Sequence, residues 1–165
     1  IETAKRLKDH NDIKFYLVGD GRARKRLESA VKKDNLDNVI FVGKVSADEA
    51  DRYIHFADCA YLSFKDNDVF NMTIPAKLQS YLACGTPILA ATSGESRDIV
   101  IKNECGCSCE RNAGKIADSI MQLKSDEKKL RLMREKSKLY YRSNYMPNKL
   151  IDDLESYLCE FDLTS

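Results

Sequence analysis

Apolar, β-branched runs alternate along the chain with stretches whose apolar residues recur every three or four positions. The runs predict strands at residues 13–18, 39–42, 59–64 and 87–90 and, more weakly, at 105–109. The first and fourth runs are almost continuously apolar, as is typical of strands covered on both faces. Strand and helix in alternation predict an α/β fold, with a parallel sheet of about five to six strands flanked by helices.

Local signals mark where several helices begin and end. Ser46 and Glu49 form a capping box, in which each side chain satisfies a backbone donor of the other residue. After Asn112 the pattern is helical only. We expect Ser125 to cap one of these helices and Pro147 to begin the last one. The apolar residues of the last helix are expected to face inward: Leu150, Ile151, Leu154, Leu158 and Phe161.

Composition bounds the class of protein. The 165 residues suit one domain, spanning residues 1–165. With 27 basic and 26 acidic residues the net charge is +1, which gives no general attraction to nucleic acid. Six cysteines with no disulfide pattern suit a reducing cytoplasm. The chain does not begin with Met and shows no signal peptide, so we expect an upstream region.

Three cysteines alternate at Cys105, Cys107 and Cys109. A strand points alternate side chains to one face, so all three are expected to face the core. A zinc site needs two-residue gaps and a second ligand pair, which this sequence lacks. The histidines His10 and His55 stand far apart in the sequence. We therefore expect no metal and no cofactor.

Glycines follow the first two predicted strands. Gly19 and Gly21 permit a sharp turn and close approach of a ligand, and a helix start after them favours anions. The third glycine of a dinucleotide fingerprint is absent, so a plain strand-to-helix turn stays open as an alternative. Gly43, Lys44 and Val45 end the second strand, where open parallel sheets bind ligands; a plain helix-entry turn is the alternative there.

The segment 71–87 is the most informative. Pro75 suits the first turn of a helix, Thr73 can cap it and Gly85 can end it. A pyrophosphate would fit at the start of such a helix, held by free backbone N–H groups and the positive end of the helix dipole.

The order and spacing of four segments carry a family resemblance. Residues 18–21, 37–46, 57–59 and 81–90 together resemble the C-terminal domain of the retaining glycosyltransferases of family 4, or group 1. The resemblance implies half of a GT-B fold, in which two Rossmann-like domains face a cleft. The variant at residues 75–81 is similar to members that build bacterial capsule and other polysaccharides.

The resemblance also implies roles for particular residues. Gly43, Lys44 and Val45 would contact the base of a UDP- or GDP-sugar, and Gly19 and Gly21 would line the cleft. The diphosphate and sugar contacts would fall to Asn71, Thr73, Ile74, Pro75 and Lys77. The two glutamates usual in this region are replaced by Met72 and Ser80; Ser80 could still bind the ribose. No catalytic residue is assigned.

The resemblance further implies a whole enzyme of hexosyltransferase type. An N-terminal domain would bind the acceptor, and the fragment alone would be inactive. Basic clusters at residues 22–33 and 128–142 are either solvated helix faces or a contact with anionic lipid, which would suit a lipid-linked acceptor at the inner membrane face. Two alternatives stay open: half of a nucleotide-sugar epimerase, which would need a histidine in the cleft, and a non-catalytic transferase-like module.

Overall fold

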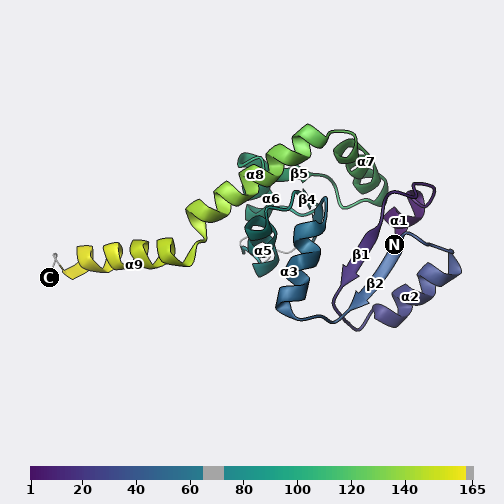
Figure 1. Ribbon diagram of the computed structural model, residues 1–165, viewed down its shortest axis with the longest axis horizontal. Coiled ribbons are helices and arrows are strands. Elements are labelled where there is room, and N and C mark those ends of the chain that lie inside the picture. The colour runs from purple at the N-terminus through teal and green to yellow at the C-terminus, as the bar shows by residue number, and fades with distance from the viewer. Residues whose placement is uncertain (65–72, 163–165) are drawn as a thin grey trace.

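The computed structural model describes residues 1–64 and 73–162 of the chain (Figure 1). Helices and strands alternate up to residue 108 and helices alone follow, as the sequence pattern predicts. In chain order the described elements are α1 (Glu2–Arg6), β1 (Phe15–Val18), α2 (Arg24–Lys33), β2 (Val39–Gly43), α3 (Ala47–Phe56), β3 (Ala60–Leu62), α5 (Ala76–Cys84), β4 (Ile88–Ala90), α6 (Glu95–Lys102), β5 (Gly106–Ser108), α7 (Ala113–Lys124), α8 (Glu127–Asn144) and α9 (Pro147–Asp162).

Every strand pair is parallel, which confirms the α/β class. The described strands form two sheets rather than the continuous sheet expected: β1 pairs with β2, and β4 lies between β3 and β5. Strand β1 contacts a helix where a neighbouring strand was expected, since the ring of Tyr16 lies 6.1 Å from that of Tyr53 on α3. Tyr16 is accordingly 55% exposed, so the prediction that both faces of this strand are covered is wrong.

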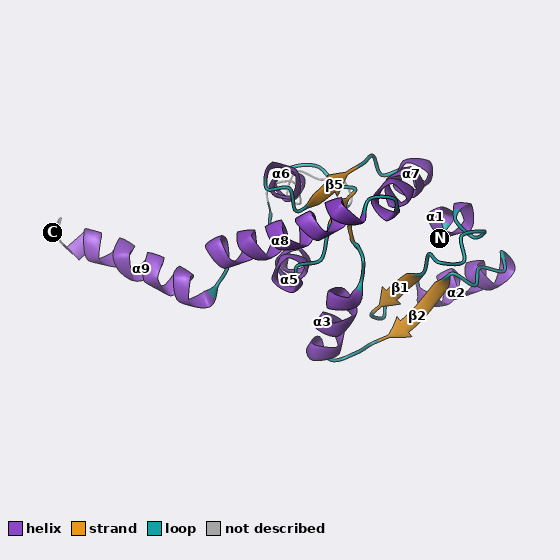
Figure 2. Ribbon diagram, turned by 45° about the horizontal axis from the view of Figure 1, so that its top comes forward, coloured by secondary structure: helices purple, strands orange, loops and turns teal. Residues whose placement is uncertain are grey.

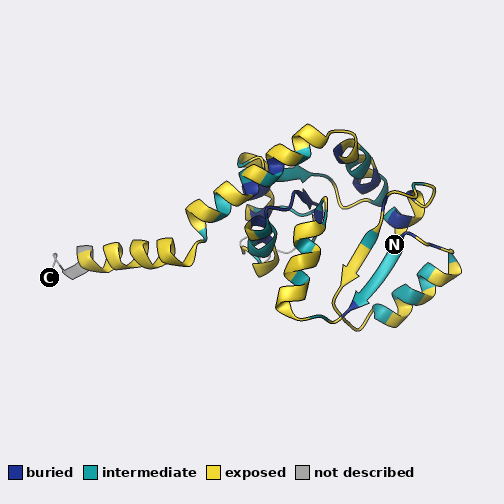
Figure 3. Cartoon of the chain, viewed as in Figure 1, coloured by how far each residue is buried: buried dark blue, intermediate teal, exposed yellow. Residues whose placement is uncertain are grey.

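The core is built on β4, which is buried on both faces (Figure 3). Ile88 and Ala90 point to one side, where they join Leu78 and Leu82 of α5. Leu89 points to the other side and meets apolar residues of α7 and α8. The alternation follows from the two-residue period of a strand, and it explains why this run carries no polar residue.

The β1–β2 pair is attached to the rest of the chain through its N-terminal end. Leu7, Ile13 and Ala117 form a small buried cluster that joins α1 to α7. The buried amide of Asn38 donates a hydrogen bond of 2.8 Å to the carbonyl oxygen of Ala4. In Figures 1 and 2, α3 lies between this pair and α5. At the carboxyl ends of β1 and β2, Val18, Gly19 and Lys44 are exposed to solvent.

Several helix ends match the sequence signals and one does not. The capping box of Ser46 and Glu49 is present, and Gly85 ends α5 in the left-handed conformation with φ of 67°. Ser125 is the C-cap of α7, and Asp126 caps α8 by accepting from the N–H of Lys129. The expectation for Ser125 is wrong by one residue because a carboxylate caps as well as a hydroxyl does.

Helix α9 begins at Pro147 as predicted, but it projects from the body with its described side chains exposed (Figure 3). Leu150, Ile151, Leu154 and Leu158 are each about half exposed, so the expectation that they face inward is wrong. The helix is amphipathic, but its apolar side chains are not covered by any described element. The side chain of Phe161 lies outside the described residues.

The alternating cysteines do not share one face. Cys105 is buried in the cluster beneath α5 and α6, whereas Cys107 and Cys109 pack on the opposite side of the sheet. Strand β5 begins only at Gly106, so Cys105 lies outside the alternation that the prediction assumed. Among the described residues no group of three or more Cys, His, Asp or Glu side chains could hold a metal ion.

Candidate functional site

The carboxyl ends of β1 and β2 meet in a glycine-rich turn. The N–H of Gly19 donates a 2.7 Å hydrogen bond to the carbonyl oxygen of Gly43. Leu17 pairs with Phe41 but Val18 with Gly43, so β2 carries one extra residue. This is a bulge, a feature that often redirects a strand beside a functional site. Gly19 has φ of 121° and Gly43 has φ of 89°, conformations that favour glycine at both positions.

A shallow depression of about 500 Å³ opens beside this turn, and Asp20, Gly21 and Lys44 line it. The carboxylate of Asp20 accepts the N–H of Gly21 at 2.8 Å, which fixes the turn. Lys44 is exposed and forms no ion pair with the described residues. Val45 follows, partly buried. The structure thus brings together the first five residues predicted for the site.

Arg24 also lies at this end of the sheet, although the sequence pattern places it only in a basic cluster. Its Nε donates to Glu28 Oε1 at 2.7 Å, and this bond raises the pKa of the guanidinium. The Nη1 atom of Arg24 would lie 3.0 Å from a Cβ added to Gly43. The spacing of Arg and Glu by four residues after a glycine turn is a signal that could have drawn attention to it.

The second half of the predicted site is the start of α5. Pro75 is the N-cap, and no side chain caps the helix there, so the predicted capping role of Thr73 is wrong. Pro75 has ψ of 147°, which is extended, so the helix begins one residue later than expected. The N–H groups of Ala76 and Lys77 have no hydrogen-bond partner among the described residues. They are the orphan donors that a helix start offers to an anion.

Helix α6 is tied to this segment. The hydroxyl of Ser96, which is 1% exposed, donates to the carbonyl oxygen of Thr73 at 3.2 Å. Gly94, the N-cap of α6, stands two residues before Ser96. The starts of α5 and α6 therefore lie side by side.

The remaining predicted residues fall on or near α5. Ile74 and Lys77 are exposed, and Ser80 is partly buried in the middle of the helix. Asn71 and Met72 lie outside the described residues. No hydrogen bond or ion pair between described residues joins the glycine turn to the start of α5. The two halves of the predicted site thus stand on different sheets.

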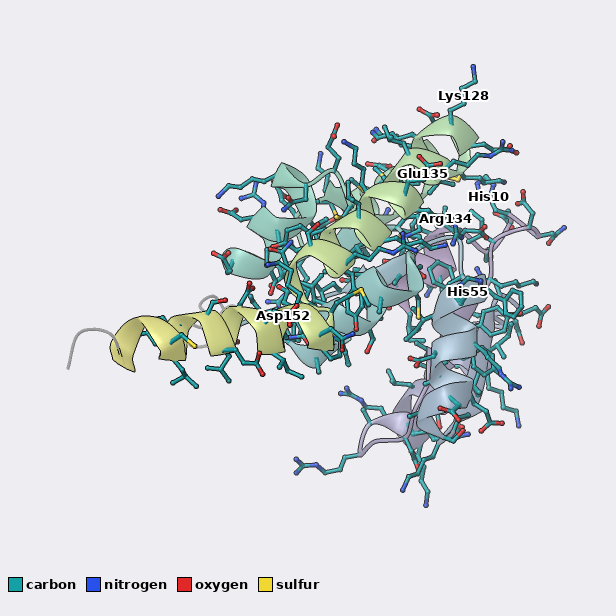
Figure 4. The ribbon with its side chains drawn as sticks, turned by 60° about the vertical axis from the view of Figure 1, so that its left-hand side comes forward. His10, His55, Lys128, Arg134, Glu135 and Asp152 are labelled. Carbon is teal, nitrogen blue, oxygen red and sulfur yellow. The ribbon has the colours of Figure 1, made fainter. Side chains whose placement is uncertain are left out.

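Neither histidine lies at the end of a described strand (Figure 4). His10 follows α1, and His55 is near the end of α3, where its Nδ1 lies 3.4 Å from the carbonyl oxygen of Cys84. The guanidinium of Arg134 donates to the carbonyl oxygens of His55 and Ala57, which caps the end of α3. This placement argues against the epimerase alternative, which needs a histidine in the cleft.

Comparison with known proteins decides the family. The profile described as "Glycosyl transferases group 1" matches residues 1–140. The chain belongs to this family. An uncharacterized glycosyltransferase of Methanocaldococcus jannaschii is 26% identical over an alignment of 135 residues, and this alignment covers 77% of this chain and 35% of that protein. The chain thus spans about a third of that relative.

Solved structures of glycosyltransferases share the fold. Anabaena HepE in complex with UDP and glucose superposes with a TM-score of 0.78 at 15% identity, over 96% of this chain and 44% of that one. Sucrose-phosphate synthase from Thermosynechococcus elongatus gives 0.75 at 20% identity, over 99% and 43%. The C-terminal domain of LpcC from Francisella tularensis gives 0.71 at 24% identity, over 88% and 77%. The half GT-B fold expected from the resemblance is confirmed.

Proposed function

We propose that this chain is the donor-binding domain of a glycosyltransferase and that it binds a nucleoside diphosphate sugar, with UDP or GDP as the nucleotide. The proposal rests on two structural features of this chain, which belongs to a family of glycosyl transferases. One is the open glycine turn beside Lys44, and the other is the free start of α5 beside Lys77. HepE, a structural neighbour, was solved with UDP-glucose.

The base would rest at Gly43, Lys44 and Val45, and the diphosphate at the start of α5. When the anomeric bond breaks, negative charge develops on the departing diphosphate. Two orphan N–H groups, the positive end of the helix dipole and the ammonium of Lys77 would stabilise that charge without a metal. Ser80, one helical turn further on, would offer its hydroxyl to the ribose.

The whole enzyme, in this proposal, contains a further domain that binds the acceptor. It transfers a hexose with retention to a growing polysaccharide or a lipid-linked glycan. The basic residues of α8 would attract anionic lipids at the cytoplasmic face of the membrane, where a lipid-linked acceptor would lie. No described helix has the length and apolar content needed to cross a membrane.

Calorimetry on this chain tests donor binding. We expect UDP or GDP to bind, and Lys77→Ala to weaken binding about tenfold because a charge-assisted contact is lost. Lys128→Ala is the matched control, since Lys128 is an exposed lysine at the far end of α8 that points away from the body (Figure 4). If no nucleoside diphosphate or nucleotide sugar binds, the proposal is wrong, and the result favours a non-catalytic transferase-like module.

A further inference from the structure

The guanidinium of Arg24 occupies the space where a side chain at position 43 would lie. A Cβ added to Gly43 would stand 3.0 Å from Nη1, 3.8 Å from Nη2 and 3.9 Å from Cζ. Gly43 itself is buried, and its neighbour Lys44 lines the depression. The forked end of Arg24 is thus set against the backbone at the mouth of the site.

Glu28 holds this guanidinium in one orientation. Its carboxylate forms an ion pair with Nε of Arg24, at 2.7 Å, and the two residues lie one helical turn apart. Neither Nη nitrogen donates a hydrogen bond to any residue in the described ranges. The Arg24 side chain is one-third exposed, so the nitrogens that lie against Gly43 stay within reach of a ligand.

Two carboxylates offset part of the positive charge of Arg24. Glu28 pairs with it directly, and the carboxylate of Asp20 acts on it from the preceding turn. The guanidinium therefore presents less net positive charge to a ligand than an unpaired arginine does. It keeps its N–H groups, however, and these can only donate. A planar group that presents carbonyl oxygens fits this fork, and the base proposed to lie at Gly43 is such a group.

We infer that Arg24 is the specificity-determining residue for the nucleobase: its Nη groups donate to a ring carbonyl oxygen, and Glu28 holds them in place. The inference rests on the proposed function, in which the base lies at Gly43. Uracil carries a carbonyl oxygen at the position where cytosine carries an amino group, and guanine differs from adenine in the same way. Arg24 can donate to the carbonyl oxygen of uracil or guanine, whereas in cytosine or adenine it would face an amino group, which is itself a donor.

Calorimetric titration of the chain with UDP, CDP, GDP and ADP tests this role. The unaltered chain is expected to prefer UDP to CDP, or GDP to ADP, by about tenfold or more, because an amino group opposite the guanidinium leaves donors unpaired. Arg24→Ala should bring that ratio close to one. Arg24→Lys keeps the charge without the fork and should also lose most of the preference. Glu28→Gln should reduce it.

Arg26→Ala is the matched control, since Arg26 is an exposed arginine on the same helix. It should leave the ratio unchanged, and circular dichroism checks that each variant is folded. The inference is overturned if the unaltered chain binds all four nucleotides equally. It is also overturned if the folded Arg24→Lys variant keeps the original ratio of UDP to CDP affinity, or of GDP to ADP affinity. The same holds if this variant binds all four nucleotides and pyrophosphate more weakly by the same factor. If the unaltered chain binds no nucleotide, the proposed function itself fails.

Discussion

The hydroxyl of Ser96 donates a 3.2 Å hydrogen bond to the carbonyl oxygen of Thr73 across 23 residues of sequence. Ser96 lies in the first turn of α6, and Thr73 precedes the start of α5. The bond fixes the segment at which the diphosphate is proposed to bind. Ser96 is almost fully buried, so it would position the proposed site without touching a ligand.

Replacing Ser96 with alanine should loosen this segment. We expect the free energy of unfolding to fall by about 1 kcal/mol, as is usual for a buried hydrogen bond, and UDP or GDP affinity to fall several-fold. Urea unfolding and calorimetry measure the two effects. Ser156→Ala is the control, because Ser156 is exposed and its hydroxyl donates to the carbonyl oxygen of Asp152 within its own helix. Equal behaviour of the two variants would show that the bond does not support the site.

Gly43→Ala should be costly at the other half of the site. Alanine would be strained at φ of 89°, and its Cβ would press against Arg24 at 3.0 Å. The expected loss is about 1–3 kcal/mol of stability, together with nucleotide binding. Gly21→Ala is matched to it, since nothing lies within 4 Å of a Cβ there. Thermal unfolding of both variants separates backbone strain from the mere addition of a methyl group.

Stability should depend on pH through Cys59. Burial raises the pKa of this thiol from 9.0 to about 12. Between these two values the unfolded chain loses the proton while the folded chain keeps it, so folding becomes less favourable as pH rises. One such group contributes at most about 1.4 kcal/mol per pH unit. Its contribution is fully present below pH 9.

Urea unfolding at pH 8 to 11 measures this effect. The stability of the unaltered chain should fall faster than that of Cys59→Ala, so the gap between them narrows as pH rises. Cys159→Ala, which removes an exposed thiol, is the control for loss of a cysteine. Parallel curves for the unaltered chain and Cys59→Ala would contradict the burial of this thiol.

Removing α9 should leave the body folded. The described side chains of this helix are all exposed, so ending the chain at Met146 should change the melting temperature by no more than about 2 °C. Leu123→Ala, at a buried core position, should lower it by many degrees. A large fall on truncation would mean that α9 packs against the body in solution.

Local signals in the sequence were enough to predict the elements. The capping box at Ser46, the helix end at Gly85 and the start of α9 at Pro147 each depend on neighbouring residues only. The glycines at the ends of β1 and β2 were likewise found, because positive φ and close approach leave few other choices. The family resemblance over the same segments is confirmed by the profile match.

Long-range arrangement could not be predicted in the same way. The separation of β1 from β3 depends on where Tyr16 packs, and the exposure of Leu154 depends on what lies beside α9. Thr73 and Ser125 failed as caps because any of several neighbouring residues can occupy that position. The role of Arg24 could not be predicted for another reason: its guanidinium lies near Gly43, which is 19 residues further along the chain, and no local pattern indicates this.

Titration of the isotope-labelled chain with UDP or GDP, followed by its backbone amide shifts, would show whether one nucleotide contacts both halves of the proposed site. We expect saturable shifts at Gly19, Gly21 and Lys44 together with Ala76 and Lys77, since one ligand would span both halves. Shifts confined to another surface, such as the groove of about 430 Å³ lined by Glu104, Lys136 and Tyr140, would contradict it. So would the absence of any shift at saturating nucleotide.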